Sequence, residues 1–433
     1  MNILKDLLHG DRVIWIIYII FITISLIEVF SASSTLAYKS GDHMAAILGH
    51  AINLGIGLFT VWVIHFIPWR WFRLVPYIVL PVSCFMLVAV SAMGLLGDAR
   101  VNGASRWLWG FQPSEFAKLG LISAIAFLIA KFQREEGCAS EAFRPLVLCI
   151  AIVFALIAPE NGSTALLIFG VSFLMMIIGR IPVRQLCKFG GTSVVLAAAF
   201  VGIIMVTPAS KYRDLPMMHR VETWQSRIRE FVQPETATPA SKYDINGKAQ
   251  RAHASIAIAK SHIFGVGPGN STQREFLPQA YSDFIFAIIV EELGLLGGAA
   301  VVFLYIMLAA RSWRIAKRCT QVFPAMLVMG LSIMIFAQAM VNLAVAVDML
   351  PITGQPLPLI SRGGSNIFIN SVFVGIILSI SRSIYDVSDD NMTQQIQESD
   401  TPKTNSTAEN INAQQRSNSS PLERGERGRQ RID

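Results

Sequence analysis

The sequence contains few charged residues for its length. Of its 433 residues, 15% are Asp, Glu, Lys or Arg, whereas soluble domains carry about a quarter. Hydrophobic residues make up 53% of the chain, and its mean hydropathy is +0.51. This scarcity of charge argues against an ordinary soluble domain and indicates that lipid is the main solvent of the chain.

Repeats and disulfide-forming cysteines are also missing. No internal repeat and no inverted pair of halves is visible, which argues against a transporter built from inverted repeats. The chain has five cysteines, and none of them falls in a loop that we assign below to the outer side of the membrane. No disulfide is therefore expected.

Long apolar segments are what the sequence does contain. A helix needs about 20 apolar residues to cross a bilayer, and isolated strands cannot satisfy their backbone groups there. The sequence therefore predicts an all-α polytopic membrane protein with about ten transmembrane helices. The expected spans are 13–31, 46–66, 74–95, 115–130, 145–158, 163–179, 190–207, 284–309, 323–345 and 366–381.

Lys and Arg residues in the short loops predict the orientation. With the N-terminus inside, the outer loops carry four of these residues, Lys39, Arg100, Arg106 and Arg362. The inner loops carry twelve, namely Arg70, Arg73, Lys131, Arg134, Arg144, Arg180, Arg184, Lys188, Arg311, Arg314, Lys317 and Arg318. Both termini are therefore expected in the cytoplasm. The net charge of +7 reflects this topology and not nucleic-acid binding.

Two regions are expected along the chain. Residues 1–387 form the ten-span membrane domain, which includes one large extracytoplasmic loop, 208–282. Apolar residues between 221 and 231 recur there at helical spacing, which fits an amphipathic helix on the membrane surface or against the bundle. Residues 252–263 are expected to form a second helix. Residues 388–433 are rich in Asn, Gln, Ser and charge and are expected to be a disordered cytoplasmic tail.

Two opposite charges stand close together near the start of the fourth span. In the segment QPSEFAK, Pro113 suits the first turn of a helix. Glu115 and Lys118 then lie at i and i+3 on one face, just inside the membrane. One interpretation is a structural ion pair. The other is that Arg106 and Lys118 are cations that bind an anionic headgroup.

Asp283 is the strongest candidate for chemistry, because it stands where the chain re-enters lipid in the segment LPQAYSDFIF. An ionisable group is costly to bury there, so it is a functional candidate by default. The alternative is that Asp283, which follows Ser282, caps the helix. Glu291 and Glu292 lie about 12 Å deeper on the same span, and capping alone does not explain them.

Two glycine-rich segments are expected on the outer side. The segment GVGPGNS, residues 265–271, resembles a nucleotide phosphate loop but lacks βαβ surroundings, so a tight turn explains it better. The segment 349–365 contains three prolines and three glycines. It is interpreted as a re-entrant loop that lines a polar cavity, with a stiff surface loop as the alternative.

Several motifs follow one another in order on the ten spans. They are NGASRW, QPSEFAK, PENGSTA, GVGPGNS, LPQAYSDFIFAIIVEELG and MLPITGQPLPLISRGGS. With these motifs, over about 13–385, the chain resembles the SEDS family (shape, elongation, division and sporulation), which includes the RodA and FtsW polymerases of bacterial cell walls. The end of the first span, Ser31-Ala32-Ser33, is more similar to the division polymerase FtsW than to RodA.

The resemblance implies a peptidoglycan glycosyltransferase of the bacterial inner membrane. It would polymerise lipid II into glycan strands at the outer face of that membrane, for septal wall synthesis. Lipid II, a class B penicillin-binding protein and other divisome proteins are the implied partners, with no nucleic acid. No tightly bound cofactor is expected, with a divalent cation, Mg²⁺ or Mn²⁺, as the candidate metal.

The resemblance also assigns residues. Asp283 corresponds to the essential acid, and inversion at the sugar requires one displacement and one general base, a role that suits this residue. The residues expected to bind substrate are Arg106, Lys118, Glu115, Ser365, Gly363 and Gly364. Three departures from the family pattern are Arg362 in place of an aromatic residue, Glu160-Asn161 in place of Asp-Leu, and Pro268 in place of an aliphatic residue.

Two other functions fit a protein with many spans. One is a lipid II flippase, although the polar candidates crowd the outer side and not the midplane. The other is a non-catalytic division scaffold, which predicts that Asp283 is dispensable.

Overall fold

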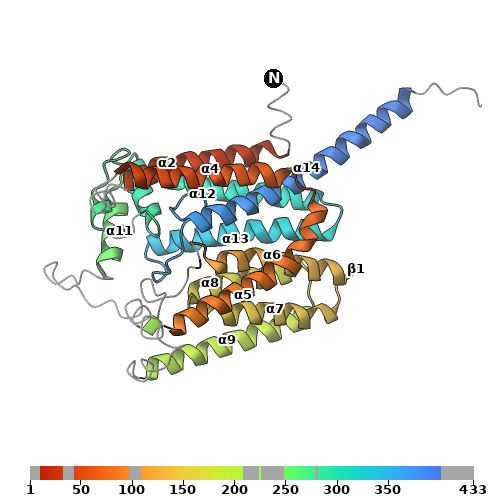
Figure 1. The fold of residues 1–433 in the computed structure, drawn as a ribbon, viewed down its shortest axis with the longest axis horizontal. Coiled ribbons are helices and arrows are strands. Elements are labelled where there is room, and N and C mark those ends of the chain that lie inside the picture. Colours follow the sequence, from red (N-terminus) through yellow and green to blue (C-terminus); the bar gives the residue numbers. More distant parts are fainter. Residues whose placement is uncertain are drawn as a thin grey trace, which may run out of the picture. The chain divides into compact units, whose positions relative to one another are not determined.

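The computed structural model describes residues 10–32, 43–96, 108, 110–207, 224–225, 248–277 and 281–400. Within these residues the protein is almost entirely helical (Figure 1), which confirms the predicted all-α class. Its one two-stranded sheet pairs β1 (Gln133–Arg134) with β2 (Gly137–Cys138) in antiparallel fashion. The long helices are α2 (Arg12–Ala32), α4 (His43–Phe66), α5 (Val75–Leu96), α6 (Pro113–Phe132), α7 (Phe143–Ile157), α8 (Gly162–Ile178), α9 (Val183–Val206), α12 (Ile285–Arg318), α13 (Val322–Ala346) and α14 (Gly364–Asp400).

Each predicted span coincides with one of these helices. In the described part of the chain, eight segments are long and apolar enough to cross a membrane. The two that are not among them are α8, which has 17 residues, and α6, which carries Glu115 and Lys118 in its first two turns. Most residues of α6 are buried against other helices. Its polar groups therefore face protein and not lipid, which is the arrangement expected of intramembrane charges.

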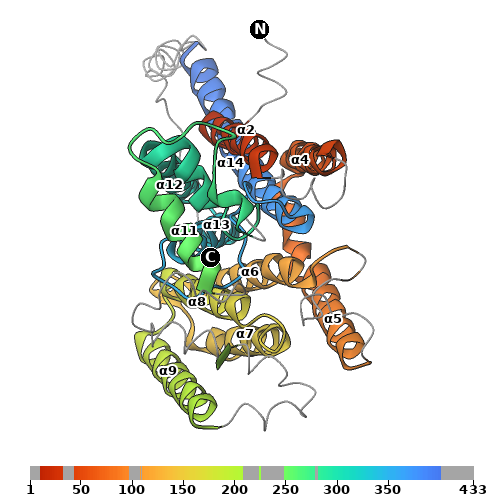
Figure 2. The same cartoon turned by 90° about the vertical axis from the view of Figure 1, so that its left-hand side faces the viewer.

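The centre of the bundle is formed by α13 and its neighbours. This helix packs against α6, α8 and α12, and the side-on view shows it among them (Figure 2). In α13 and in α14, 72% of the membrane-spanning residues are buried inside the protein, whereas in α9 only 6% are. Polar side chains on α6, α13 and the start of α14 are therefore removed from lipid and need partners within the protein.

Helix α12 is interrupted at Gly294, where φ is +76° and ψ is −177°. The segment 262–267 fills the interruption. Two of its amides donate to the carbonyls of Glu291 and Glu292, and two of its carbonyls accept from the amides that follow Gly294. These four bonds replace helical ones that the break removes, as backbone groups in a membrane require.

The glycine-rich segment 265–271 is a series of tight turns, as predicted. Gly265, Gly267 and Gly269 all have positive φ, of +71°, +91° and +84°. A Cβ atom on Gly265 would collide with the backbone of Glu292 and Gly294. The glycines therefore allow the close approach of this segment to the broken helix.

The long loop and the C-terminal tail are described in part. Helix α11 (Lys248–Lys260) confirms a second helix in the loop, displaced from the expected 252–263. The amphipathic helix expected at 221–231 lies almost wholly outside the described residues. The chain divides into two compact units, 1–384 and 385–433. Helix α14 continues to Asp400, past the expected domain boundary at 387, and 401–433 lie outside the described residues.

Candidate active site

Asp283 lies half-buried in the turn before α12. Helix α12 has Phe284 at its N-cap position, and the side chain of Phe284 makes no cap hydrogen bond. Asp283 thus stands one residue before the N-cap. Its Oδ1 accepts from Ser282 Oγ at 3.0 Å. On the other side, a Cβ atom added to Gly354 would lie 3.6 Å from Oδ2. The carboxylate therefore lies between Ser282 and Gly354 of the 351–363 segment.

The segment 351–363, between α13 and α14, enters the bundle without helical structure. Leu357, Leu359 and Ile360 are at most 2% exposed. Burial of non-helical backbone at this depth requires protein partners for its polar groups. The structure therefore agrees with a re-entrant loop, and the alternative of a surface loop is wrong.

This buried segment is hydrogen-bonded to the two residues just before Asp283. Ser361 Oγ donates to the carbonyl of Ser282 at 2.6 Å and accepts from the amide of Leu357 at 2.8 Å. The amide of Arg362 donates to the carbonyl of Tyr281 at 3.0 Å. Any movement of the segment therefore moves the backbone that carries the carboxylate.

Two amide side chains of α13 also bind the backbone of Asp283 and of the 351–363 segment. Asn342 Nδ2 donates to the carbonyls of Asp283 and Gln355, at 3.0 and 2.8 Å. One turn earlier, Gln338 Nε2 donates to the carbonyl of Pro356 at 3.0 Å. Gln338 and Asn342 are at most 1% exposed, so these bonds form out of contact with solvent and fix the position of Asp283 relative to the bundle.

Lys118 and Glu115 form a buried ion pair on α6. The Lys118 Nζ lies 2.7 Å from Glu115 Oε1 and 2.9 Å from Gln338 Oε1, and the two charged side chains are 1% and 3% exposed. Asn366 Nδ2 approaches Glu115 Oε2 at 3.4 Å. The structural interpretation of the pair is thus supported. Through Gln338, Lys118 also belongs to the hydrogen-bond network that reaches Asp283.

The predicted residues of the last loop lie at the start of α14. Ser365 Oγ donates to the carbonyl of Gly110 at 3.3 Å and accepts from the amide of Gln112 at 3.2 Å. Ser365 therefore joins α14 to the chain that leads into α6. Gly363 and Gly364 stand directly before it. Arg106 lies outside the described residues, so its placement remains a prediction.

Glu291 and Glu292 have a role of their own, at the break in α12. They accept hydrogen bonds from the segment 269–273, including its amides at 2.9 to 3.4 Å. Glu292 also accepts from the hydroxyl of Ser31 and lies 3.9 Å from Arg274 Nη1. These carboxylates hold the outer loop against α12 and α2.

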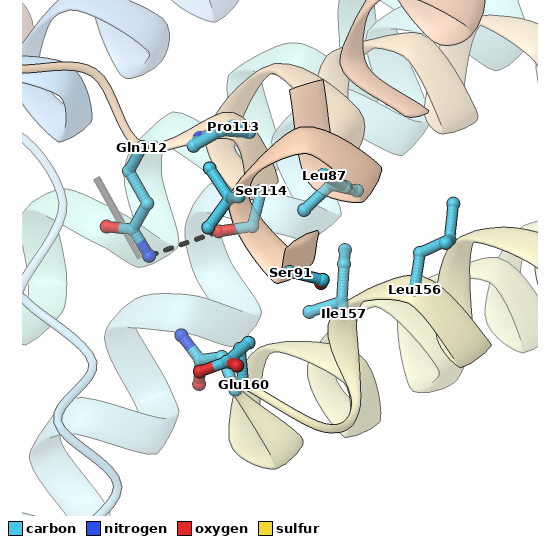
Figure 3. A pocket seen from close by; sticks show the side chains of 10 residues that line it. Leu87, Ser91, Gln112, Pro113, Ser114, Leu156, Ile157 and Glu160 are labelled. Carbon is cyan, nitrogen blue, oxygen red and sulfur yellow. Dashed lines mark hydrogen bonds between the residues drawn. The ribbon is translucent and has the colours of Figure 1, made fainter. Parts of the chain in front are cut away.

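A small pocket that is partly open to solvent lies where α5, α6 and the α7–α8 turn meet. The polar side chains of Gln112, Ser114 and Glu160 face it opposite Leu87, Leu156 and Ile157 (Figure 3). The pocket therefore has a polar and an apolar side, and it opens next to the QPSEFAK motif.

The pocket connects to the network around Asp283. Asn161, which lines it, accepts from the amide of Thr164 at 3.3 Å. The hydroxyl of Thr164 in turn accepts from Gln355 Nε2 at 2.7 Å. The structure thus joins the α7–α8 turn, the 351–363 segment and α13 into one buried hydrogen-bond network.

Potential metal ligands do not gather in the described residues. No group of three or more His, Cys, Asp or Glu side chains is close enough together there to hold an ion.

Sequence reasoning missed Gln338, Asn342 and Gln355. A signal for the first two was present, because they are the polar amides of an otherwise apolar span and stand at i and i+4, on one helix face. Buried polar groups in a membrane span need partners. Their spacing could have marked α13 as the helix that faces the site.

The fold agrees with comparisons to known proteins. The model of the family described as "Cell cycle protein" (FtsW, RodA and SpoVE) matches residues 11–386. The chain belongs to the SEDS family.

Relatives within this family are about 30% identical in sequence to the chain. The probable peptidoglycan glycosyltransferase FtsW of Alcanivorax borkumensis is 32% identical over 82% of this chain and 88% of its own length. The peptidoglycan glycosyltransferase MrdB of Escherichia coli is 30% identical over 87% and 94%. Stage V sporulation protein E of Bacillus subtilis is 29% identical over 86% and 97%.

Solved SEDS structures share the fold. A chain from a peptidoglycan synthase complex superposes with a TM-score of 0.67 at 22% identity, over 87% of this chain and 98% of that chain. RodA of Thermus thermophilus superposes with a TM-score of 0.59 at 21% identity, over 88% and 99%. The predicted SEDS membership is confirmed.

Proposed function

We propose that this SEDS protein polymerises lipid II into glycan strands at the outer face of the bacterial inner membrane. The observation that carries the proposal is Asp283, a half-buried residue whose carboxylate accepts from Ser282. Its backbone carbonyl accepts from Asn342, and the carbonyl of Ser282 accepts from Ser361 of the 351–363 segment. The relatives named peptidoglycan glycosyltransferases support the same activity.

The chemistry requires one base and one displacement. The 4-hydroxyl oxygen of the acceptor sugar attacks the anomeric carbon of the donor, and the bond from that carbon to the diphosphate oxygen breaks. Asp283 accepts the hydroxyl proton, and the lipid diphosphate leaves with the bonding electrons. Partial burial suits a carboxylate for this role, because loss of solvent makes it a stronger base.

Binding of the substrate is assigned to Arg106, Lys118, Glu115, Ser365, Gly363 and Gly364. Gly363 precedes α14 and Gly364 is its first residue, and the N-terminus of a helix favours anionic groups such as a diphosphate. Arg106, and Lys118 with Glu115, complete the expected set. A divalent cation, Mg²⁺ or Mn²⁺, would help to neutralise the diphosphate, and no step of the mechanism is assigned to it.

The setting of the reaction belongs to the proposal as well. The distribution of Lys and Arg supports cytoplasmic termini, which places Asp283 on the outer side. A class B penicillin-binding protein would then crosslink the strands. The related chain from a complex of polymerisation and crosslinking supports such a partner. Septal synthesis with other divisome proteins is proposed over elongation, on the FtsW-like end of the first span.

Polymerisation of purified lipid II tests the function. The purified protein, alone and with its class B penicillin-binding protein, should convert lipid II into glycan strands that a gel resolves by length. Absence of product in both mixtures would contradict the proposal. Transfer of fluorescent lipid II across liposomes without polymerisation would favour the flippase, and activity of neither kind would favour the scaffold.

A further inference from the structure

We propose that Arg362 binds the diphosphate of the lipid-linked donor sugar. The inference rests on the proposed function, since it assigns a ligand within the same site. It concerns a cation that stands in this chain immediately before the paired glycines at the start of α14.

Arg362 is held directly beside the turn that carries Asp283. Its amide donates to the carbonyl of Tyr281 at 3.0 Å, and its guanidinium carbon lies 5.5 Å from the centre of the Tyr281 ring. The preceding residue, Ser361, bonds to the carbonyl of Ser282. Backbone and side chain of Arg362 are thus both fixed to residues one or two positions from the proposed base.

The guanidinium of Arg362 carries a charge that the described residues do not neutralise. It forms no ion pair among them, and its buried Nη1 atom has no hydrogen-bond partner there. The other cations of the site region differ in this respect. Lys118 is paired with Glu115, and Arg274 lies close to Glu292.

A guanidinium without an ion-pair partner favours an anionic ligand with several acceptor oxygens. A diphosphate meets this description better than a carboxylate or a neutral sugar group. Guanidinium presents a planar fork of donors that matches two phosphate oxygens, and it stays protonated at any physiological pH. The negative charge that develops on the leaving diphosphate needs such a partner near the reacting carbon. Arg362 as a whole is partly exposed, so a ligand can approach the guanidinium from the side away from its buried Nη1 atom.

Inorganic pyrophosphate is a direct probe of this site. Isothermal titration of the full-length protein in detergent should detect its binding, and Arg362→Ala should weaken that binding by about 10-fold or more, the value of a lost charge-assisted hydrogen bond. In lipid II polymerisation the same variant should raise the KM more than it lowers the kcat. Arg362→Lys should recover part of both losses, because it keeps the charge but not the fork.

Arg134→Ala is the matched control. It removes one positive charge from an exposed residue just beyond the far end of α6, and it should leave pyrophosphate binding and KM unchanged. If Arg362→Ala does not fold, the Arg362→Lys variant decides the question by the same two measurements. Wild-type binding that survives in both Arg362 variants, or no wild-type binding at all, overturns the inference. A wild-type protein that binds pyrophosphate but makes no glycan contradicts the proposed function instead.

Discussion

At the scale of single residues, the candidate site depends on side chains that bind backbone carbonyls. Asn342 holds the carbonyls of Asp283 and Gln355 together, and Gln338 links Pro356 to Lys118. Such bonds do not take part in chemistry. They set where the reacting carboxylate stands, and a displacement of about 1 Å is enough to lower a rate severely.

Replacement of Asn342 by Leu tests this positioning role. Leu keeps most of the volume of the side chain but cannot donate, so the backbone of Asp283 loses its fixed distance to the 351–363 segment. We expect the kcat of lipid II polymerisation to fall by about 100-fold, with a small change in KM. Unchanged kcat in a folded Asn342→Leu protein would show that the carboxylate is held by other contacts.

The Glu115–Lys118 pair allows a second test at this scale. Lys118→Met leaves a buried carboxylate without its cation, and loss of one partner of a buried pair costs about 3–5 kcal/mol. The double variant Glu115→Gln, Lys118→Met removes both charges, so it should unfold closer to the wild-type temperature. The measurement is thermal unfolding in detergent.

Polymerisation by that double variant separates the two interpretations of Lys118. A stable, active double variant assigns the pair to structure alone. A stable double variant with a raised KM for lipid II assigns Lys118 to substrate binding as well.

The sequence predicted part of this residue-scale arrangement. The i and i+3 spacing of Glu115 and Lys118 was sufficient for the ion pair, because helical geometry alone brings these side chains together. The bonds of Asn342 and Ser361 could not be predicted, since their partners are backbone carbonyls far away in the sequence. Asp283 was found from its cost of burial, and it stands one residue before the N-cap of α12.

At the scale of elements, the break in α12 and the segment 262–267 depend on each other, because their backbones are joined by hydrogen bonds. The break places Glu291 and Glu292 where they can bind the 269–273 segment. The apolar pattern predicted α12 as a span but gave no sign of the break. The positive φ of a single glycine can be predicted only when the segment that pairs with the break is known.

Gly294→Ala tests whether the 262–267 segment needs a glycine at the break in α12. A side chain at φ +76° is strained, and its Cβ atom would collide with the backbone of the 262–267 segment, so we expect a loss of stability of about 2 kcal/mol or more. Gly191→Ala is the control, because α9 has open space at that position, and it should stabilise the helix by up to about 1 kcal/mol. Equal unfolding temperatures for the two variants would contradict the account of the break.

At the scale of the whole molecule, apolar length and charge bias determine the architecture. The spans were predictable because lipid requires long apolar helices, and α6 departs from that rule because it is buried by other helices. The relative burial of α9 and α13 was not predictable, since both have similarly apolar sequences and differ in their neighbours.

Cysteine labelling tests the orientation of the bundle. In a background without the five natural cysteines, Met349→Cys lies near the Asp283 end, and Glu141→Cys lies just beyond the far end of α6. Both native side chains are exposed. A membrane-impermeant maleimide should label Met349→Cys in intact spheroplasts and Glu141→Cys only after lysis. The reverse pattern would place Asp283 in the cytoplasm, away from an extracellular reaction.

The most direct measurement of the central claim is lipid II polymerisation by the Asp283→Asn protein. Asn has nearly the same shape as Asp and can still accept from Ser282, but it cannot take up the proton of the sugar hydroxyl. Asp348→Asn serves as control, because Asp348 is an exposed acid after α13 with φ +63°, a conformation that Asn also adopts. The account predicts no detectable glycan from a folded Asp283→Asn protein and a normal rate from Asp348→Asn. Polymerisation by Asp283→Asn at the wild-type rate would contradict it.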